Sequence, residues 1–210
     1  MRSPDLSLAD PRLSTIRNKL LSLEDGLGPF PETSGDRTHA AVSVVLREGK
    51  ELELLLIKRA EADGDPWSGQ MALPGGRRDP SDTSLLQTAM RETAEETSVF
   101  LGEGGVHLGR LEPAAPATTR LPPITIFPYV FGVPVGTEAR VSSREVDEVL
   151  WVPLPELQKP GATGTIKIRY GDNGSREFPC MRFEGRVIWG LTFRILTGLF
   201  EILHTARPTR

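Results

Sequence analysis

Several residue classes are scarce in this chain of 210 residues, and each scarcity excludes a class of protein. Cys180 is its one cysteine, which rules out an internal disulfide, fits a reducing compartment and reads as a small buried side chain. No apolar run is long enough to span a membrane, and the first residues lack the apolar core of a signal peptide, so we expect a cytoplasmic protein. A net charge of −3, from 25 basic and 28 acidic residues, argues against a dedicated nucleic-acid binder.

The residues that are present indicate a turn-rich α/β protein with one good core. Hydrophobic residues make up 38% of the chain, and its 21 glycines and 18 prolines are scattered between apolar segments. We divide the chain into a tail with a helix, residues 1–38, and a single domain, residues 39–210. Asp10, as an N-cap before Pro11, predicts where the first helix begins. We expect this helix to pack either on the core or on a second subunit. A homodimer is therefore a possibility.

Four later segments have recognisable patterns. Residues 39–60 predict two strands around a turn near Gly49, and the second strand is almost wholly apolar, as in the interior of a sheet. Residues 124–135 predict either a strand pair or one bent strand, and residues 159–180 predict a hairpin or a lid. The apolar residues 186–208 predict a buried C-terminal helix, because charged residues interrupt them too often for a membrane span.

The chemistry is expected between Gly69 and Val99, where a Gly-Gly turn leads through an acidic loop into a helix. Ser81 and Asp82 are the candidate N-caps, and the following residues contain no glycine or proline. Gly75 in the turn allows a close backbone approach to a phosphate or an ion.

Three carboxylates are expected to share one side of that helix. Glu92 and Glu96 are four residues apart, and Glu95 is three residues from Glu92. Like charges at this spacing repel one another, and a bound cation would relieve the repulsion. With neither His nor Cys in the stretch, oxygen ligands favour Mg²⁺ or Mn²⁺. The alternative is the solvated acidic face of an ordinary helix, which the adjacent Arg91 and the glycine turn make less attractive.

The order Gly-Gly, acid, Arg91-Glu92-Thr93-Ala94-Glu95-Glu96 resembles the Nudix box, GX5EX7REUXEEXGU, in which U is aliphatic. The resemblance implies an α/β/α sandwich with a mixed sheet, here with added N-terminal and C-terminal helices. It also implies cleavage of a diphosphate linked to a nucleoside, with Mg²⁺ or Mn²⁺. The box departs from the pattern in four ways: Asp82 replaces the first glutamate, one extra residue precedes Arg91, Thr93 replaces an aliphatic residue and Ser98 replaces the final glycine.

By the same resemblance, side chains can be assigned to roles. The implied metal ligands are Gly76 through its carbonyl, Glu92, Glu95 and Glu96. Either Glu92 or Glu95 takes the proton of the attacking water, and Arg91 pairs with a carboxylate and fixes its orientation. Outside the box, Glu145 and Glu148 are the nominees for a further ligand or the base.

The segments flanking the box resemble the coenzyme A pyrophosphatase branch of this family. GQMALPGG at residues 69–76 carries the resemblance, together with Leu55-Leu56 and Arg59 upstream. It implies 3′,5′-ADP and 4′-phosphopantetheine as the products. The cations nominated for substrate phosphate are Arg59, Arg77, Arg78 and Arg120. Arg77 and Arg78 also have a plainer interpretation, as exposed side chains.

Two alternatives stay open at this point. One is a Nudix hydrolase of ADP-ribose, dinucleoside polyphosphates or nucleoside triphosphates. The other is a non-catalytic Nudix-fold regulator that binds nucleotides, suggested by the departures at Asp82 and Ser98. Whether the substrate is coenzyme A or one of these other nucleotides, the expected partner is a small molecule. Neither a nucleic acid nor a membrane is expected as a partner.

Overall fold

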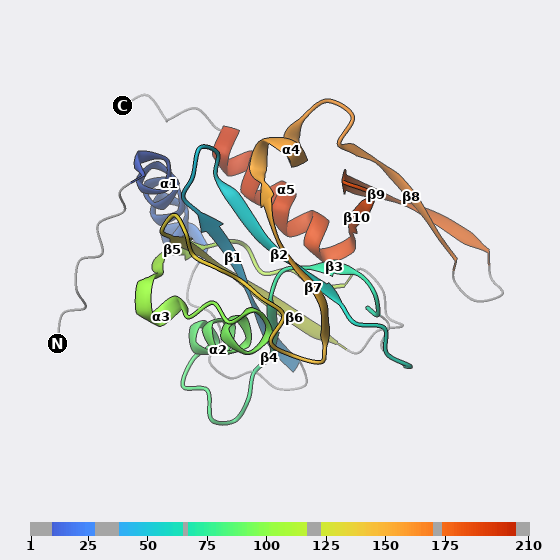
Figure 1. Ribbon diagram of the computed structural model, residues 1–210, viewed down its shortest axis with the longest axis horizontal. Coiled ribbons are helices and arrows are strands. Elements are labelled where there is room, and N and C mark those ends of the chain that lie inside the picture. Colours follow the sequence, from blue (N-terminus) through green and yellow to red (C-terminus); the bar gives the residue numbers. More distant parts are fainter. Residues whose placement is uncertain (1–9, 28–37, 65–66, 117–122, 170–173, 205–210) are drawn as a thin grey trace.

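The computed structural model describes residues 10–27, 38–64, 67–116, 123–169 and 174–204. A twisted sheet lies at the centre, with helices on both of its faces, and a smaller sheet extends to one side (Figure 1). Within the described ranges the helices are α1 (Pro11–Leu27), α2 (Leu85–Thr97), α3 (Leu101–Gly104), α4 (Leu154–Gln158) and α5 (Gly190–His204). The strands are β1 (Thr38–Arg47), β2 (Glu53–Arg59), β3 (Met71–Ala72), β4 (Gly75–Arg77), β5 (Val106–Arg110), β6 (Ile124–Val133), β7 (Val146–Pro153), β8 (Thr163–Arg169), β9 (Ser175–Phe183) and β10 (Arg186–Trp189).

The central sheet is mixed, as the resemblance implies. Its strands run in the order β3-β2-β1-β6-β5, with β4 also paired to β1 and β7 to β2. Strand β1 is parallel to β6 along its full length and antiparallel to β2, so the predicted two strands around Gly49 are confirmed. The region 124–135, for which a strand pair was one option, contains one long strand, because β1 offers ten consecutive residues as its partner.

Alternating side chains on the strands build one core on each face of the sheet. In β1, Val44 and Leu46 face the core under α1 and α5, whereas Ala41 and Val45 face the core under α2 and α3. Strand β6 alternates in the same way, and Phe127 belongs to the second core. The structure is therefore a sandwich of helix, sheet and helix layers.

Helix α1 begins at the predicted residue and joins the first core. The carboxylate of Asp10 accepts a hydrogen bond from the backbone N–H of Arg12 at 2.8 Å, as an N-cap does. The apolar side chains at helical spacing, Leu13, Ile16 and Leu20, are buried. Helix α1 shares a core with the sheet. The division of the chain at residue 38 stays a prediction.

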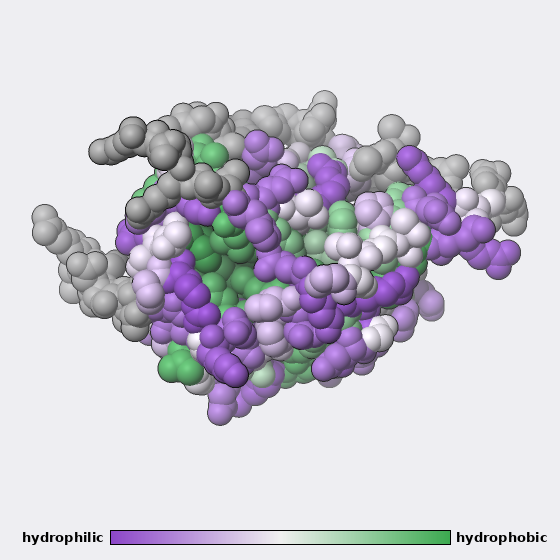
Figure 2. Space-filling model, turned by 90° about the horizontal axis from the view of Figure 1, so that it is seen from above, coloured by the Kyte–Doolittle hydropathy of each residue, from purple (hydrophilic) through white to green (hydrophobic). Residues whose placement is uncertain are grey.

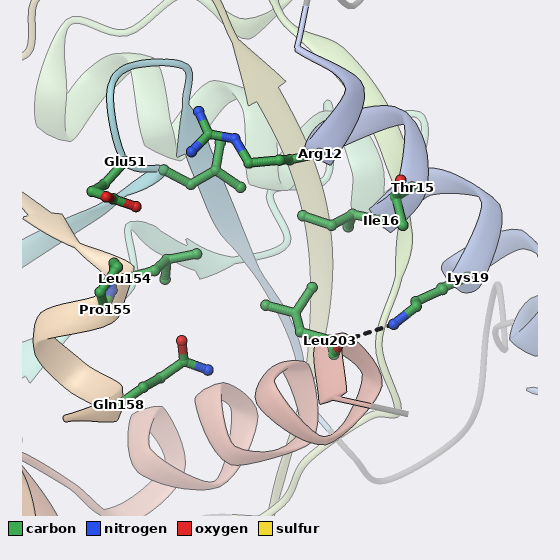
Figure 3. Close-up of a pocket in the computed structure, with 10 residues that line it drawn as sticks. Arg12, Thr15, Ile16, Lys19, Glu51, Leu154, Pro155, Gln158 and Leu203 are labelled. Carbon is green, nitrogen blue, oxygen red and sulfur yellow. Dashed lines mark hydrogen bonds between the residues drawn. The ribbon is translucent and has the colours of Figure 1, made fainter. Parts of the chain in front are cut away.

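Helices α1, α4 and α5 border a cavity of about 310 Å³ (Figure 3). On this side of the molecule, apolar side chains lie between bands of hydrophilic ones (Figure 2). Lys19 lies in the cavity and donates to the carbonyls of Ile202 and Leu203 at 3.0 and 2.8 Å, which gives the last turn of α5 partners for its free acceptors. Among the described residues that line it, Glu51 is the one acid, and Arg12 and Lys19 are the basic residues.

The C-terminal region corrects one expectation. Residues 186–208 are not one helix: Arg186–Trp189 form strand β10, paired with β9, and the helix begins at Gly190. Val187, Ile188 and Trp189 are residue types that favour strands, and Gly190, at φ 66°, makes the change of direction. The predicted hairpin in residues 159–180 is present as β8 and β9, and Cys180 is buried. None of the described helices has the length and apolarity to cross a membrane.

Candidate active site

The Gly75-Gly76 turn lies on a short strand, β4, paired with β1. Gly75 has a φ of 154°, and a Cβ added there would lie 2.3 Å from the carbonyl oxygen of Ala41. A Cβ on Gly76 would lie 2.4 Å from the carboxylate carbon of Glu92. Position 75 therefore requires glycine so that β4 can pair with β1, and glycine at position 76 leaves room for the Glu92 carboxylate beside the backbone.

Helix α2, which carries the acids, begins later than the sequence predicts. Its N-cap is Ser84, whose hydroxyl oxygen accepts from the N–H of Gln87 at 3.1 Å, and the side chain of Gln87 accepts in turn from the N–H of Thr83. The expectation of Ser81 or Asp82 as the cap was wrong, because the carboxylate of Asp82 has other partners.

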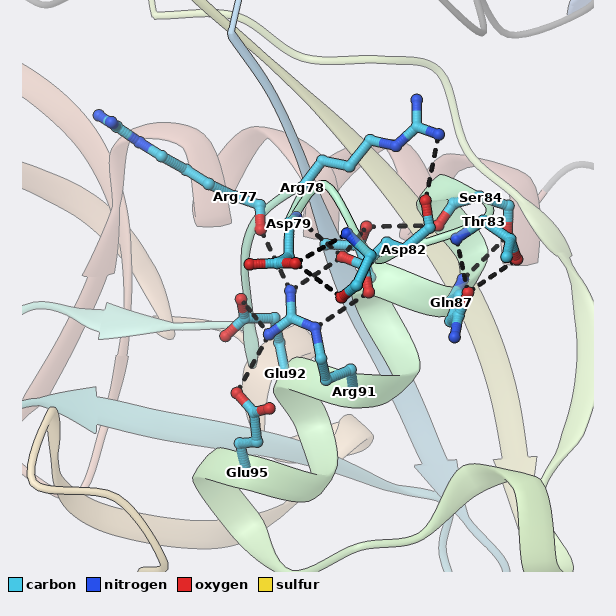
Figure 4. A network of polar contacts seen from close by, with 12 residues as sticks. Arg77, Arg78, Asp79, Asp82, Thr83, Ser84, Gln87, Arg91, Glu92 and Glu95 are labelled. Carbon is cyan, nitrogen blue, oxygen red and sulfur yellow. Dashed lines mark hydrogen bonds and ion pairs between the residues drawn. The ribbon is translucent and has the colours of Figure 1, made fainter.

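Asp82 is an anchor beneath the acidic cluster. Its side chain is 1% exposed and accepts hydrogen bonds from Arg91 Nε and Nη2 at 3.0 and 2.9 Å, from the hydroxyl of Thr88 and from the N–H of Asp79 (Figure 4). The Arg91 guanidinium is the main cause that lowers the pKa of Asp82 to about 2. Asp82 therefore stays charged and holds Arg91 in place.

Arg91 connects that anchor to the acids of the helix. Its Nη1 donates to Glu92 at 2.9 Å and to Glu95 at 3.1 Å, and its Nη2 also donates to the carbonyl of Arg77 at 3.3 Å (Figure 4). The predicted pairing of Arg91 with a carboxylate is thus present, with two helix acids as well as Asp82. One guanidinium sets the positions of both side chains.

The three helix glutamates have different surroundings. Glu96 is 4% exposed, and its carboxylate accepts from the N–H of Gly75 at 2.9 Å. Burial raises the pKa of Glu96 to about 8, and burial also raises the pKa of Glu92. The side chain of Glu95 is more than half exposed. Two acids therefore face a low-dielectric site, in which a cation would offset the cost of their charges.

The donor atoms fit a hard divalent ion. In the part of the chain that the structure describes, no three His, Cys, Asp or Glu side chains converge closely enough to hold a metal by themselves. An ion here would need backbone, water or substrate oxygens as well, and magnesium commonly binds proteins in this way. The carboxylate of Glu92 lies where a Cβ on Gly76 would be, so this side-chain ligand is held against the glycine turn.

Two of the box's departures have clear local consequences. Ser98 ends α2 in the left-handed conformation, with φ 57° and its N–H on the carbonyl of Ala94, so it occupies the position where the box has glycine. Thr93, in place of an aliphatic residue, is fully buried and satisfies its hydroxyl with the Ser43 hydroxyl at 2.8 Å and the Ala89 carbonyl at 2.7 Å. Neither departure disturbs the acids.

Glu92 and Glu95 open onto a cavity of about 550 Å³ with a charged end and an apolar end, whereas Glu96 is buried against the N–H of Gly75 and is not among the described lining residues. The charged end contains the glycine turn, Glu92 and Glu95, and two of the nominated cations, Arg59 and Arg77. Arg78 is not among the described lining residues, and its guanidinium donates to the carbonyl of Asp82 at 3.2 Å. Arg120 lies outside the described residues. Trp67 also lines this cavity.

The structure separates the two acids nominated outside the box. Glu145 lines the cavity with Glu92, and its charge contributes to the raised pKa of Glu92. Glu148 instead pairs with Arg186 of β10, with an Nε–Oε2 distance of 2.9 Å, and this pairing lowers the pKa of Glu148. Of these two residues, Glu145 is therefore the candidate for the site.

The apolar end of the cavity was missed by sequence reasoning. Its residues come from β6, β10 and α5, far from the glycine turn in the sequence, and include Ile124, Ile126, Trp189, Leu191, Thr192 and Ile195. Treating residues 186–208 as a packing helix assigned the apolar C-terminal members, Trp189, Leu191 and Ile195, to the core. The one available signal was Gly190, which separates a strand-forming run from a helix-forming run.

Three comparisons relate this chain to known proteins. The NUDIX domain family matches residues 37–169. A protein of Schizosaccharomyces pombe, "Uncharacterized protein C14C4.10c", is 37% identical over 118 residues, which are 55% of this chain and about a third (36%) of that protein. "Uncharacterized Nudix hydrolase NudL" of Yersinia enterocolitica is 32% identical over 169 residues, which are 80% of this chain and 83% of that protein. A MutT/nudix family protein from Enterococcus faecalis is similar in fold, with 20% identity and a TM-score of 0.50 over 93% of this chain and 73% of that one.

Proposed function

This chain belongs to the NUDIX domain family, and from that membership we propose a particular substrate for it. It is a hydrolase of pyrophosphate bonds in nucleotide-linked substrates. We propose that it cleaves coenzyme A or its acyl derivatives to 3′,5′-ADP and (acyl-)4′-phosphopantetheine, with Mg²⁺ or Mn²⁺, in the cytoplasm. The observation that carries the proposal is the cavity whose charged end continues directly into an apolar end.

The chemistry of coenzyme A has the same two parts. Its diphosphate and 3′-phosphate are anionic, and its pantetheine arm has a branched dimethyl group close to the diphosphate. Arg59 and Arg77 line the charged end and are the proposed partners of the phosphates. The backbone at Gly75 permits close approach, although its N–H is engaged by Glu96 in this structure. A volume of about 550 Å³ is within the usual range for small-molecule sites.

The proposed metal ligands are the carbonyl of Gly76 and the carboxylates of Glu92, Glu95 and Glu96. When bound, a divalent ion supplies charge neutralisation at the diphosphate and activation of water. Glu96 is already held by the N–H of Gly75, and Glu92 by Arg91, so neither acid has to be ordered when substrate arrives.

The remaining task is to remove a proton from the attacking water. Glu92 and Glu95 are the proposed acceptors within the box, and Glu145 is the acceptor proposed from outside it, because it lines the same cavity. Arg91 is a positioning residue for this step, since its guanidinium contacts the carboxylates of Glu92 and Glu95.

A substrate panel tests the proposal. Coenzyme A, ADP-ribose, a dinucleoside tetraphosphate and a nucleoside triphosphate are each incubated with the full chain and Mg²⁺ or Mn²⁺, and the phosphate products are identified by chromatography and mass spectrometry. We expect equal amounts of 3′,5′-ADP and 4′-phosphopantetheine from coenzyme A. Cleavage of ADP-ribose while coenzyme A stays intact would reject this substrate, and tight nucleotide binding without any cleavage would favour the regulator.

A further inference from the structure

Part of the cavity wall comes from outside the segment that matches the NUDIX domain family. That match ends at residue 169, whereas Trp189, Leu191, Thr192 and Ile195 belong to β10 and α5. We call these four residues the C-terminal wall. Family members share the hydrolytic chemistry, so a wall built by a separate segment is a place where this chain can select what is attached to the diphosphate.

The residues of the C-terminal wall are fixed in place by packing contacts. Ile195 is 6% exposed and belongs to the core under α5, and Leu191 packs against that core while remaining half-buried. The Trp189 ring contacts the ring of Phe178 on β9 with centroids 5.5 Å apart. The Arg186–Glu148 ion pair ties β10 to the central sheet. A ligand therefore meets a preformed apolar surface, which avoids the cost of ordering it.

Strand pairing gives the distance from the β6 part of the apolar end to the charged end. Ala40 of β1 pairs with Arg77 of β4 on one side and with Ile126 of β6 on the other, and Ile126 lines the apolar end. Neighbouring strands lie about 4.8 Å apart, so the backbone at Ile126 is roughly 10 Å from the backbone at Arg77. A substrate with its diphosphate over the glycine turn is therefore long enough to place one of the two groups attached to that diphosphate at the apolar end.

We propose that the C-terminal wall binds the pantetheine arm of the substrate, with its branched dimethyl group against Leu191 and Ile195. The inference rests on the proposed function and names the half of the substrate that this wall recognises. The branched aliphatic side chains of Leu191 and Ile195 complement a dimethyl group, and the Trp189 ring, tilted against Phe178, adds apolar surface beside them. Thr192 supplies one hydroxyl, which suits the hydroxyl and amide groups of the arm.

The two halves of coenzyme A make separate probes for the test. Binding of 4′-phosphopantetheine and of 3′,5′-ADP to the full chain is measured by calorimetry in the presence of Mn²⁺. In Leu191→Ala we expect the dissociation constant of 4′-phosphopantetheine to rise about tenfold, the usual effect of removing methyl groups from an apolar pocket, while that of 3′,5′-ADP stays unchanged. Ile202→Ala, a half-buried residue of the same helix that does not line this cavity, is the matched control and should change neither.

Thr192→Val keeps the shape of the side chain and replaces Leu191→Ala in the test if that variant fails to fold. It should raise the dissociation constant of 4′-phosphopantetheine by a smaller factor and leave that of 3′,5′-ADP unchanged. Selective weakening of 3′,5′-ADP would instead assign the wall to the nucleotide, and equal weakening of both probes, or no binding of 4′-phosphopantetheine to the unaltered chain, would overturn the inference. The proposed function fails separately, by a lack of coenzyme A cleavage in the panel. If coenzyme A is cleaved and Leu191→Ala leaves its KM unchanged, the function stands and the inference falls.

Discussion

The two ends of the cavity are built in different ways. The charged end comes mainly from one continuous segment, in which a glycine turn, an anchoring aspartate and a helix with three glutamates follow one another. The apolar end is gathered from β6, β10 and α5, which the fold brings together. In this chain the helix acids and the glycine turn follow one another in the sequence, whereas the apolar end is assembled from segments that are distant in the sequence.

The sharpest separation of the two ends comes from Glu96→Gln. Glutamine can keep an oxygen for the N–H of Gly75 but carries no charge to hold a cation, so we expect kcat to fall about 10²- to 10³-fold. Unfolding in denaturant without added metal should show no loss of stability, because an amide is cheaper to bury than a carboxylate. Glu103→Gln, at an exposed acid of α3, is the control. Full activity in Glu96→Gln would remove that residue from the charged end.

Asp82→Asn tests the anchor of the charged end. The pKa of Asp82 is lowered from 3.8 to about 2, which corresponds to a contribution of about 2 kcal/mol to the free energy of unfolding at neutral pH. Because the folded pKa is the lower one, this contribution is fully present above pH 3.8 and is lost as the pH falls toward 2. Chemical denaturation across that pH range should therefore show the gap between the two proteins closing.

Asp147→Asn is the comparison for that measurement, since its carboxylate makes an exposed pair with Lys58, and exposed pairs contribute little to stability. Equal losses in Asp82→Asn and Asp147→Asn would show that Asp82 does not anchor Arg91.

Ser98→Gly probes the end of the helix that carries the acids. Ser98 is held at φ 57°, a conformation that costs a residue with a Cβ about 1–2 kcal/mol and glycine little. Glycine loses more chain entropy on folding, so we expect a net gain in the free energy of unfolding of about 0.5–1 kcal/mol, measured by thermal and chemical denaturation. Ser142→Gly, at an exposed serine without a positive φ, should bring no gain. A loss of stability in Ser98→Gly would contradict this account of the cap.

Glu148→Gln examines the connection of the apolar end to the central sheet. The Arg186 pair is partly exposed, so the loss of stability should be no more than about 1 kcal/mol. We expect KM for coenzyme A to rise a few-fold while kcat is kept, because β10 carries Trp189 but none of the acids. Steady-state kinetics beside Glu156→Gln, a surface acid of α4, measures this. A fall in kcat with KM unchanged would place Glu148 at the charged end.

What the sequence could predict follows the same division. The helix acids and the glycine turn are local patterns, and the structure has both of them, whereas the left-handed conformation of Ser98 was not predicted. The N-cap of α2 was predicted at the wrong residue because Ser81, Asp82 and Ser84 are all good capping residues. The choice among them depends on the ion pair between Asp82 and Arg91, which lies nine residues further along the chain.

The apolar end could not be predicted for a different reason. Whether Trp189 and Leu191 face a core or a cavity depends on how β10 pairs with β9 and where α5 lies over the sheet. Both positions are set by tertiary packing. In the sequence, an apolar residue that lines a cavity cannot be told from one that lies in a core. The exclusion of Glu148 likewise depends on Arg186, which is far away in the sequence.

The central claim is that the acids of α2 and the Gly76 carbonyl hold a divalent ion where a diphosphate can reach it. Anomalous diffraction from crystals of the full chain grown with Mn²⁺ and 4′-phosphopantetheine measures this directly. We expect a manganese peak among the oxygens of Glu92, Glu96 and Gly76, with the phosphate on the same ion. A structure with the phosphate bound and these acids holding no manganese would contradict the account.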